Sequence, residues 1–153
     1  MLWVMSLDQV WSVYSAINTA IIGLTTGVTT LNGVNVEWLY QNIPFDEQRL
    51  TAPNYIRVLV ESMTSIPASL TNQRGALYNR RGNITCDIRA AIHKGAHDGD
   101  AIVAGLQTLF ERKAITVTGT NQLYTEGFTI NDIGNVNFYV LNLVLPFNYW
   151  EVI

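Results

Sequence analysis

Two stretches of the chain alternate between apolar and polar residues, and this alternation constrains the fold more than any other feature. From Gly82 to Ala90 the small or apolar residues are Gly82, Ile84, Cys86, Ile88 and Ala90, and the polar ones are Arg81, Asn83, Thr85, Asp87 and Arg89. A period of two is typical of a β-strand with one buried face. Residues 136–147 alternate in the same way, and we expect Pro146 to end the ladder pairing of that strand.

Two other segments have the spacing of amphipathic helices. Residues 7–22 carry apolar side chains at helical intervals, and Ser6 with Gln9 fits a capping box. Residues 99–113 carry a second apolar stripe, and Asp98 is the predicted N-cap. Short β-like stretches occur at "VNVEWLYQN", "NYIRVLVES", "AITVTG" and "LYTEGFTI".

Together these patterns predict an α+β fold in one domain spanning residues 1–153. We expect a mixed, largely antiparallel sheet with two main helices packed on it. A long, irregular arm between strands is expected at residues 63–81. Residues 1–5 are interpreted as a disordered extension, and the sequence leaves open whether Met1 or Met5 is the start.

The composition favours a globular protein with few surface charges. Only 14% of the residues are charged and 48% are hydrophobic, with a net charge of −3, whereas a typical domain has about a quarter charged residues. Such a surface is expected where partner subunits cover it. A monomer with a surface of Asn, Thr, Ser and Gln is the alternative. The net charge predicts no nucleic-acid or lipid footprint over the whole chain, and no apolar run is long enough to span a membrane.

The chain's chemically reactive residues gather in one stretch but do not form a recognisable active site. Cys86 lies on the apolar face of its predicted strand, which favours an inert core thiol. His93 and His97 are separated by a glycine-containing turn, so their spacing is a weak metal-binding signal. We therefore predict no catalytic, cofactor-binding or metal-binding residues. The alternative from another class is a small cytoplasmic enzyme that uses Cys86, His93 or His97.

Basic and aromatic residues of the expected arm are the candidate interface. Arginine and tyrosine are enriched at protein interfaces. The alternatives are a solvated loop and a surface that faces nucleic acid. The candidate residues for contact with neighbouring subunits or a tail tube are Arg74, Leu77, Tyr78, Arg80 and Arg81.

Three stretches of the sequence resemble phage tail-terminator proteins. "YQNIPF" followed by "APNYIRVLV" resembles the first two strands of that family, where an Asn-x-Pro-Phe-like turn precedes a Pro-Tyr-hydrophobic strand. "RRGNITCDIRAAIHKGAHDGDAIVAGLQTLFERK" is similar to the strand, turn and helix that follow. "NFYVLNLVLPF" resembles the closing strand. The resemblance extends over residues 7–147, although the "HDGD" turn and the arm are not clear family features.

This resemblance implies a structural protein of the virion, made in the cytoplasm of a host bacterium. The family's subunits form a ring, expected to be a hexamer, that caps the head-proximal end of the tail tube and stops its polymerisation. The implied partners are other copies of the chain, the tail tube protein and a head completion or connector protein. Double-stranded DNA passes through the opening without sequence readout, and no cofactor or membrane is implied. Another neck, adaptor or tail ring protein remains the alternative within this class.

Overall fold

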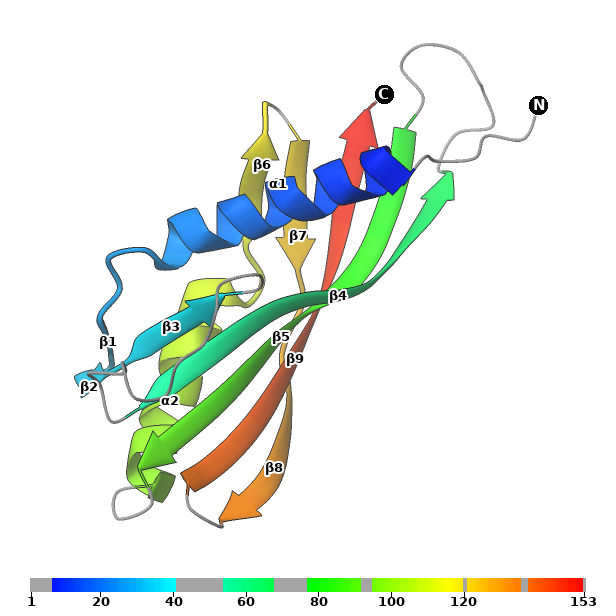
Figure 1. The fold of residues 1–153 in the computed structure, drawn as a ribbon. Coiled ribbons are helices and arrows are strands. Elements are labelled where there is room, and N and C mark those ends of the chain that lie inside the picture. Colours follow the sequence, from blue (N-terminus) through cyan, green and yellow to red (C-terminus); the bar gives the residue numbers. More distant parts are fainter. Residues whose placement is uncertain are drawn as a thin grey trace.

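The computed structural model describes residues 7–40, 54–67, 77–91, 95–119, 121–135 and 138–152 (Figure 1). It has the expected α+β architecture. The elements in chain order are α1 (Leu7–Thr25), β1 (Thr30–Leu31), β2 (Val34–Asn35), β3 (Glu37–Tyr40), β4 (Tyr55–Pro67), β5 (Leu77–Ala91), α2 (Gly95–Phe110), β6 (Ala114–Thr118), β7 (Asn121–Thr125), β8 (Thr129–Asn135) and β9 (Phe138–Val152).

The sheet is mixed and largely antiparallel, as predicted. Its strand order is β3-β4-β5-β9-β7-β6, and β8 pairs with β9 beside this path. Only β3 and β4 are parallel among these pairs. The long strands β4, β5 and β9 run the length of the molecule, with α1 across one end and α2 along the other (Figure 1).

Each helix covers one end of the sheet, and the two ends are called the α1 half and the α2 half. The α1 half contains β6, β7, residues 77–82 of β5 and residues 147–152 of β9. The α2 half contains β8, residues 83–91 of β5 and residues 138–146 of β9. α1 contacts β6 and β4, and α2 contacts β5 and β9, so each half has one covered face.

The alternating residues of β5 and β9 form the hydrophobic core between the sheet and the helices. Ile84, Cys86 and Ile88 of β5 are fully buried. They are opposite Leu145, Leu143 and Leu141 of β9 in the register. The predicted helical stripe lies on the same side, where Ile102, Leu106 and Phe110 are also fully buried. The alternation therefore identified the covered face correctly.

The expectation that Pro146 ends the pairing of its strand is wrong. β9 continues to Val152, and Pro146 is opposite Asn83 of β5. On its other side β9 changes partner at this point, from β7 at Phe147 to β8 at Val144. The Pro146 carbonyl accepts a hydrogen bond from the Glu126 N–H at 3.0 Å. Proline is tolerated because its missing N–H falls where β9 lacks a continuous partner strand.

Both helices occur where they were predicted, with different ends. α1 extends three residues further than expected, to Thr25, whose hydroxyl donates to the Ile21 carbonyl at 3.0 Å. α2 begins at Gly95, not 99, so Asp98 lies in its first turn and is not the N-cap. The Asp98 carboxylate instead accepts a hydrogen bond from the Asn54 side chain at 3.4 Å, and its negative charge still suits the helix N-terminus.

α2 ends at Phe110, three residues before the expected end at residue 113. Arg112 has a φ of 52°, in the left-handed region that terminates a helix. The Thr125 hydroxyl donates to the Phe110 carbonyl and accepts a hydrogen bond from the Lys113 N–H at 2.9 Å. A contact distant in sequence thus fixes the end of this helix.

The described parts of the irregular arm expected at residues 63–81 are strand. β4 continues to Pro67 and β5 begins at Leu77, with pairing from Thr64 opposite Arg81 to Pro67 opposite Tyr78. A bulge between Glu61 and Thr64 shifts the register and obscures the alternation in the sequence. Residues 68–76 lie outside the described part of the chain. The stretch "LYTEGFTI" likewise contributes to two strands, β7 and β8, rather than one.

Candidate interaction surface

The residues of the enzyme alternative are not assembled into a site within the described structure. Cys86 is buried in the core, and desolvation together with the neighbouring Asp87 raises its pKa to about 12. The thiol is therefore protonated near neutral pH. His97 is 90% exposed on α2, with Nδ1 3.4 Å from an Asp98 oxygen. His93 lies outside the described residues.

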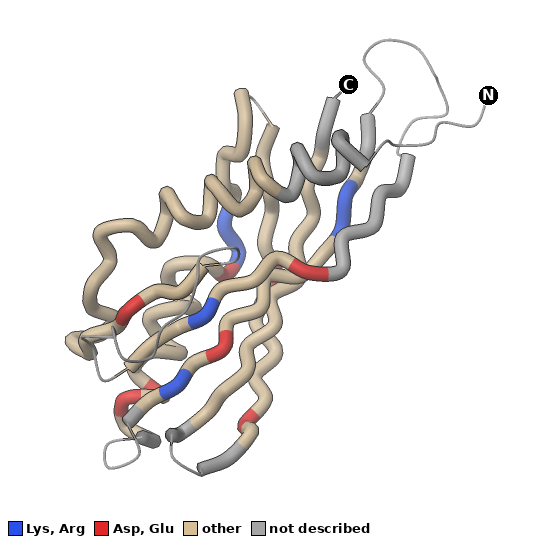
Figure 2. The backbone as a smooth tube through the Cα atoms, viewed as in Figure 1, with Lys and Arg blue, Asp and Glu red and all other residues tan. Residues whose placement is uncertain are grey.

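The described residues contain no group of three or more His, Cys, Asp or Glu side chains arranged to hold a metal ion. None of the described helices combines the length and apolar character that crossing a membrane requires. In Figure 2, acidic and basic residues are interspersed along the described strands and do not gather in one strongly charged patch.

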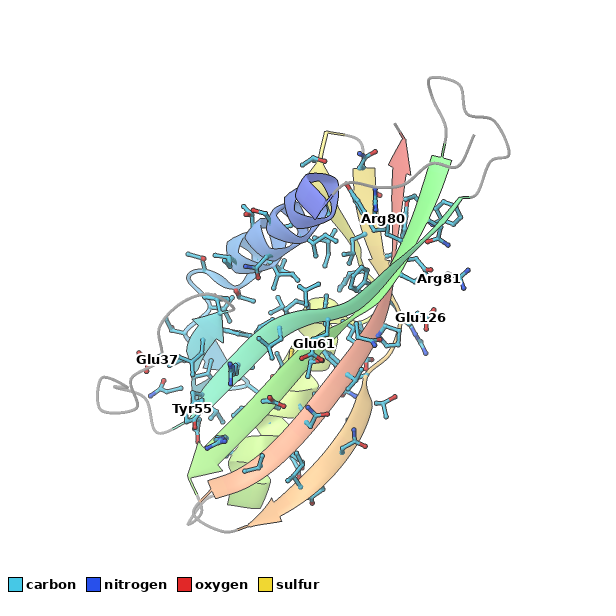
Figure 3. The ribbon with its side chains drawn as sticks, turned by 45° about the vertical axis from the view of Figure 1, so that its right-hand side comes forward. Glu37, Tyr55, Glu61, Arg80, Arg81 and Glu126 are labelled. Atoms are coloured by element: carbon cyan, nitrogen blue, oxygen red, sulfur yellow. The ribbon has the colours of Figure 1, made fainter. Side chains whose placement is uncertain are left out.

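Strand β5 places two residues of the proposed interface, Arg80 and Arg81, on opposite faces of the sheet. Arg80 is only 2% exposed and is opposite the buried Tyr149, so it faces the side covered by α1. Arg81 is exposed on the opposite face (Figure 3), because neighbouring residues of a strand point to opposite faces. Leu77 and Tyr78 belong to β5, but only their backbones are described. Arg74 lies outside the described residues.

The open face of the α1 half displays Arg81 together with aromatic side chains. Arg81, Asn148 and Tyr124 are register partners across β5, β9 and β7, and cross-strand partners share a face. Tyr124 is 45% exposed, and Trp150, two residues beyond Asn148, is 36% exposed. Arg81, Tyr124, Asn148 and Trp150 are called the Arg81 face below.

A shallow hollow of about 380 Å³ adjoins the Arg81 face. Its lining comes from β5, β9 and the segment after β7: Arg81, Gly82, Asn83, Glu126, Pro146, Phe147 and Asn148. The hollow lies where β9 passes from β7 to β8, because Pro146 and Phe147 mark that change of partner. Arg81 comes from β5 and Glu126 from the segment after β7, and Figure 3 shows the two residues close together at the same margin of the sheet. The Arg81 face and this hollow together present a positive side chain (Arg81), a negative one (Glu126), two exposed aromatic rings and the side-chain amides of Asn83 and Asn148.

The open face of the α2 half carries Val140 and Val144 together with polar side chains that bind one another. The Asn142 side-chain N–H donates to Asp87 at 2.6 Å, and Asn131 donates to Asn142 at 3.4 Å. These three residues form a row across β8, β9 and β5 that is called the polar ladder below. Thr85 donates to Glu61 at 3.2 Å on the same face. The polar side chains of this face therefore form hydrogen bonds with one another within the chain.

Strand β8 at the margin of the α2 half carries exposed apolar residues. Its only strand partner in the described sheet is β9. Ile130 is 45% exposed and Ile133 is 64% exposed, with Asp132 between them. Proteins commonly protect an edge strand with Lys, Pro or a covering element. β8 contains neither Lys nor Pro, although a bulge between Asp132 and Gly134 interrupts its register.

A second hollow, of about 510 Å³, lies between the end of α1 and β3. Its polar groups hold the two elements together. The Trp38 indole N–H donates to the Val28 carbonyl at 2.7 Å, and the hydroxyls of Thr25 and Tyr40 form a hydrogen bond. These bonds explain how β3 is attached to the end of α1, and they give this hollow a structural role.

Sequence reasoning found Arg81 and missed Tyr124, Trp150 and the burial of Arg80. The even-numbered inward face could have been extended from Gly82 to Arg80, which would have predicted its burial. Trp150 was missed because the strand was expected to end at Pro146. Tyr124 was missed because its partner strand was not foreseen, and no local signal identifies that partner.

Comparisons with known proteins define the fold alone. No family model matches the sequence, and no curated protein does. One solved structure is 15% identical to this chain and has a TM-score of 0.61. The match covers 95% of this chain and 96% of the other. At this identity the similarity indicates a shared α+β fold and assigns no activity.

Proposed function

We propose that the protein is a structural subunit of a phage tail that forms a ring, with the hexamer as the expected state. The ring caps the head-proximal end of the tail tube, stops tube polymerisation and joins the tail to a head completion or connector protein. The observation that carries this proposal is the resemblance to tail-terminator proteins of three stretches of the sequence, which lie between Tyr40 and Phe147.

Two properties of the chain support this proposal. The observed α+β fold is the fold class that the resemblance implies. The chain has few charged residues, and its Arg81 face combines arginine, tyrosine and tryptophan, the residue types most enriched at binding hot spots. Both properties suit a subunit whose surface is covered by partners.

The proposed location is the neck of the virion, after synthesis in the cytoplasm of the host. Double-stranded DNA passes through the ring opening, and the net charge of −3 suits passage rather than tight binding to phosphates. The proposal includes no catalytic step. The rival nucleophile, Cys86, is buried with a raised pKa, whereas a catalytic cysteine needs an accessible thiolate.

The assembly state of the purified protein tests the proposal. Mass photometry and negative-stain electron microscopy should detect closed rings, either of the protein alone or on the tips of tail tubes. Tubes polymerised without the protein should be longer than tubes polymerised with it. A protein that forms no rings and leaves tube length unchanged would exclude the terminator role.

A phage that lacks the protein distinguishes this role from that of another neck protein. Loss of a terminator should give overlong tails that do not join heads. Loss of a different neck or adaptor protein should give tails of normal length and unjoined heads. Tail lengths in electron micrographs supply the measurement.

A further inference from the structure

The exposed large apolar residues of the described chain fall into two groups on different halves of the sheet. Tyr124 and Trp150 belong to the Arg81 face, and Ile130 and Ile133 belong to β8. β7 pairs with β9 at residues 147–149, whereas β8 pairs with β9 at residues 139–144. Within one copy, β8 is therefore held beside β9 in the α2 half and does not cover the Arg81 face.

The two groups are complementary in charge and chemistry. β8 carries Asp132 between its exposed isoleucines, and the Arg81 face carries an exposed arginine beside two aromatic side chains. The adjoining hollow of about 380 Å³ leaves room for a side chain of the partner beside Pro146 and Asn148. Glu126, which also lines this hollow, suits the outward N–H groups of an edge strand.

We propose that β8 of one subunit docks on the Arg81 face of the next subunit, with Asp132 directed to Arg81. This inference rests on the proposed ring and names the surfaces that close it. The contact joins two different surfaces, so it is heterologous, and a repeated heterologous contact closes into a ring when its rotation permits. The partner is a second copy of this chain.

Charge reversal with mixing tests this contact. Arg81→Glu and Asp132→Arg should each reduce the ring fraction about tenfold, because like charges then face each other at every contact. Each single variant retains one wild-type surface. In an equimolar mixture the reversed Arg81 site meets the reversed Asp132 site, and the two wild-type surfaces meet each other. The mixture should therefore recover rings with alternating subunits, and the double variant Arg81→Glu/Asp132→Arg should also assemble.

Matched charge reversals elsewhere are the controls. Lys113→Glu and Asp100→Arg change exposed residues that lie outside the Arg81 face and β8. Both should form rings at the wild-type fraction in mass photometry. Circular dichroism of all variants should show the wild-type secondary structure, so that loss of rings reports on contact.

Cross-linking gives a second measurement that does not depend on charge or on disrupting the fold. The native Cys86 is fully buried, so engineered surface cysteines react selectively. Ile133→Cys and Gln122→Cys proteins should form a covalent dimer with a short bismaleimide when they are mixed, because Gln122 lies beside Tyr124 on the same face of β7. Neither protein alone should do so, because each then presents cysteine on only one side of the contact.

The outcomes separate this inference from the proposed function. Either of two results would overturn the β8 contact and leave the ring proposal standing. In the first, both single reversals form rings at the wild-type fraction. In the second, the single variants lose rings, and mixing restores no rings and gives no mixed cross-links. Absence of rings in the wild-type protein, alone and on tubes, would overturn both. Recovery in the mixture together with mixed cross-links would establish the contact.

Discussion

The two halves of the sheet share β5 and β9 but use their open faces differently. In the α2 half the polar ladder connects Asn131, Asn142 and Asp87 through hydrogen bonds within the chain. In the α1 half the Arg81 face displays exposed aromatic side chains beside a hollow. The comparison indicates that one open face contributes to the stability of the subunit, whereas the other is available for binding.

The difference arises from residue type at equivalent positions of the same strands. The ladder uses short side chains, whose carboxylate and amide groups reach the neighbouring strand directly. Arg81 and Trp150 have long or bulky side chains that extend beyond the backbone surface. Substitutions in the two halves should therefore affect stability and assembly differently.

The largest expected effect is loss of core packing in the α2 half. Phe110 is fully buried and packs edge-on against Phe128, with ring centroids 6.3 Å apart. Phe110→Ala should lower the free energy of unfolding by about 3–5 kcal/mol. Trp150→Ala on the Arg81 face should change it by only about 0.5 kcal/mol. Urea denaturation of both variants measures the contrast, and equal losses would contradict it.

A glycine at the junction of the halves should give the next largest effect. A Cβ at Gly82 would lie 2.9 Å from a Phe147 ring carbon and 3.0 Å from the Glu61 carbonyl oxygen. Gly82→Ala should therefore cost about 1–3 kcal/mol of stability. Gly23 in α1 is the control, because a Cβ there meets no atom within 4 Å. Gly23→Ala should stabilise the protein by about 0.5–1 kcal/mol in the same denaturation assay.

The buried thiol predicts how stability depends on pH. The pKa of Cys86 is about 12 in the folded protein, against a reference value of 9.0. Above pH 9 the unfolded chain loses this proton while the folded chain retains it, so stability falls as pH rises through the window between these values. Between pH 8 and 10 the wild type should lose about 1 kcal/mol more than Cys86→Ala.

The Cys86→Ala variant supplies its own control at lower pH. At pH 7 it should be less stable than the wild type by about 1 kcal/mol, because a small cavity replaces the sulfur. Its assembly should be unchanged. A pH-independent stability difference between the two proteins would show that burial does not suppress ionisation of this thiol.

The smallest expected effect concerns the polar ladder. Asn142→Ala removes the hydrogen bonds with Asp87 and Asn131 and should cost about 0.5–1.5 kcal/mol while rings still form. Tyr124→Ala should show the opposite pattern, with nearly unchanged stability and fewer rings. Denaturation and mass photometry on the same samples measure both quantities. Loss of rings in Asn142→Ala would contradict the assignment of the two faces.

The fold was largely predictable because its signals are local in the chain. The period of two from Gly82 to Ala90 and the stripe containing Ile102 and Leu106 were sufficient to predict a half-buried strand and a packed helix. The end of α2 was not predictable in this way. It depends on Thr125, which binds the Phe110 carbonyl only after β7 has been positioned.

The candidate site was less predictable because tertiary pairing creates it. Pro146 indicated the end of a strand in the sequence, but the partner change from β7 to β8 allows β9 to continue through it. Trp150 consequently joins the sheet face. Arg80, which was grouped with Arg81, faces the covered side because the inward alternation continues to residue 80. Residue type alone could not separate these two arginines.

The position of β9 in the chain has a consequence for the timing of assembly. β9 follows every other strand of the sheet and pairs with β5, β7 and β8. A nascent chain still lacking β9 has neither Asn148 and Trp150 on the Arg81 face nor the strand that holds β8 in place. Both sides of the proposed contact therefore form only when this strand joins the sheet. If the proposed contact closes the ring, incomplete chains on a polysome would lack both of its surfaces, and only subunits with a finished sheet would assemble.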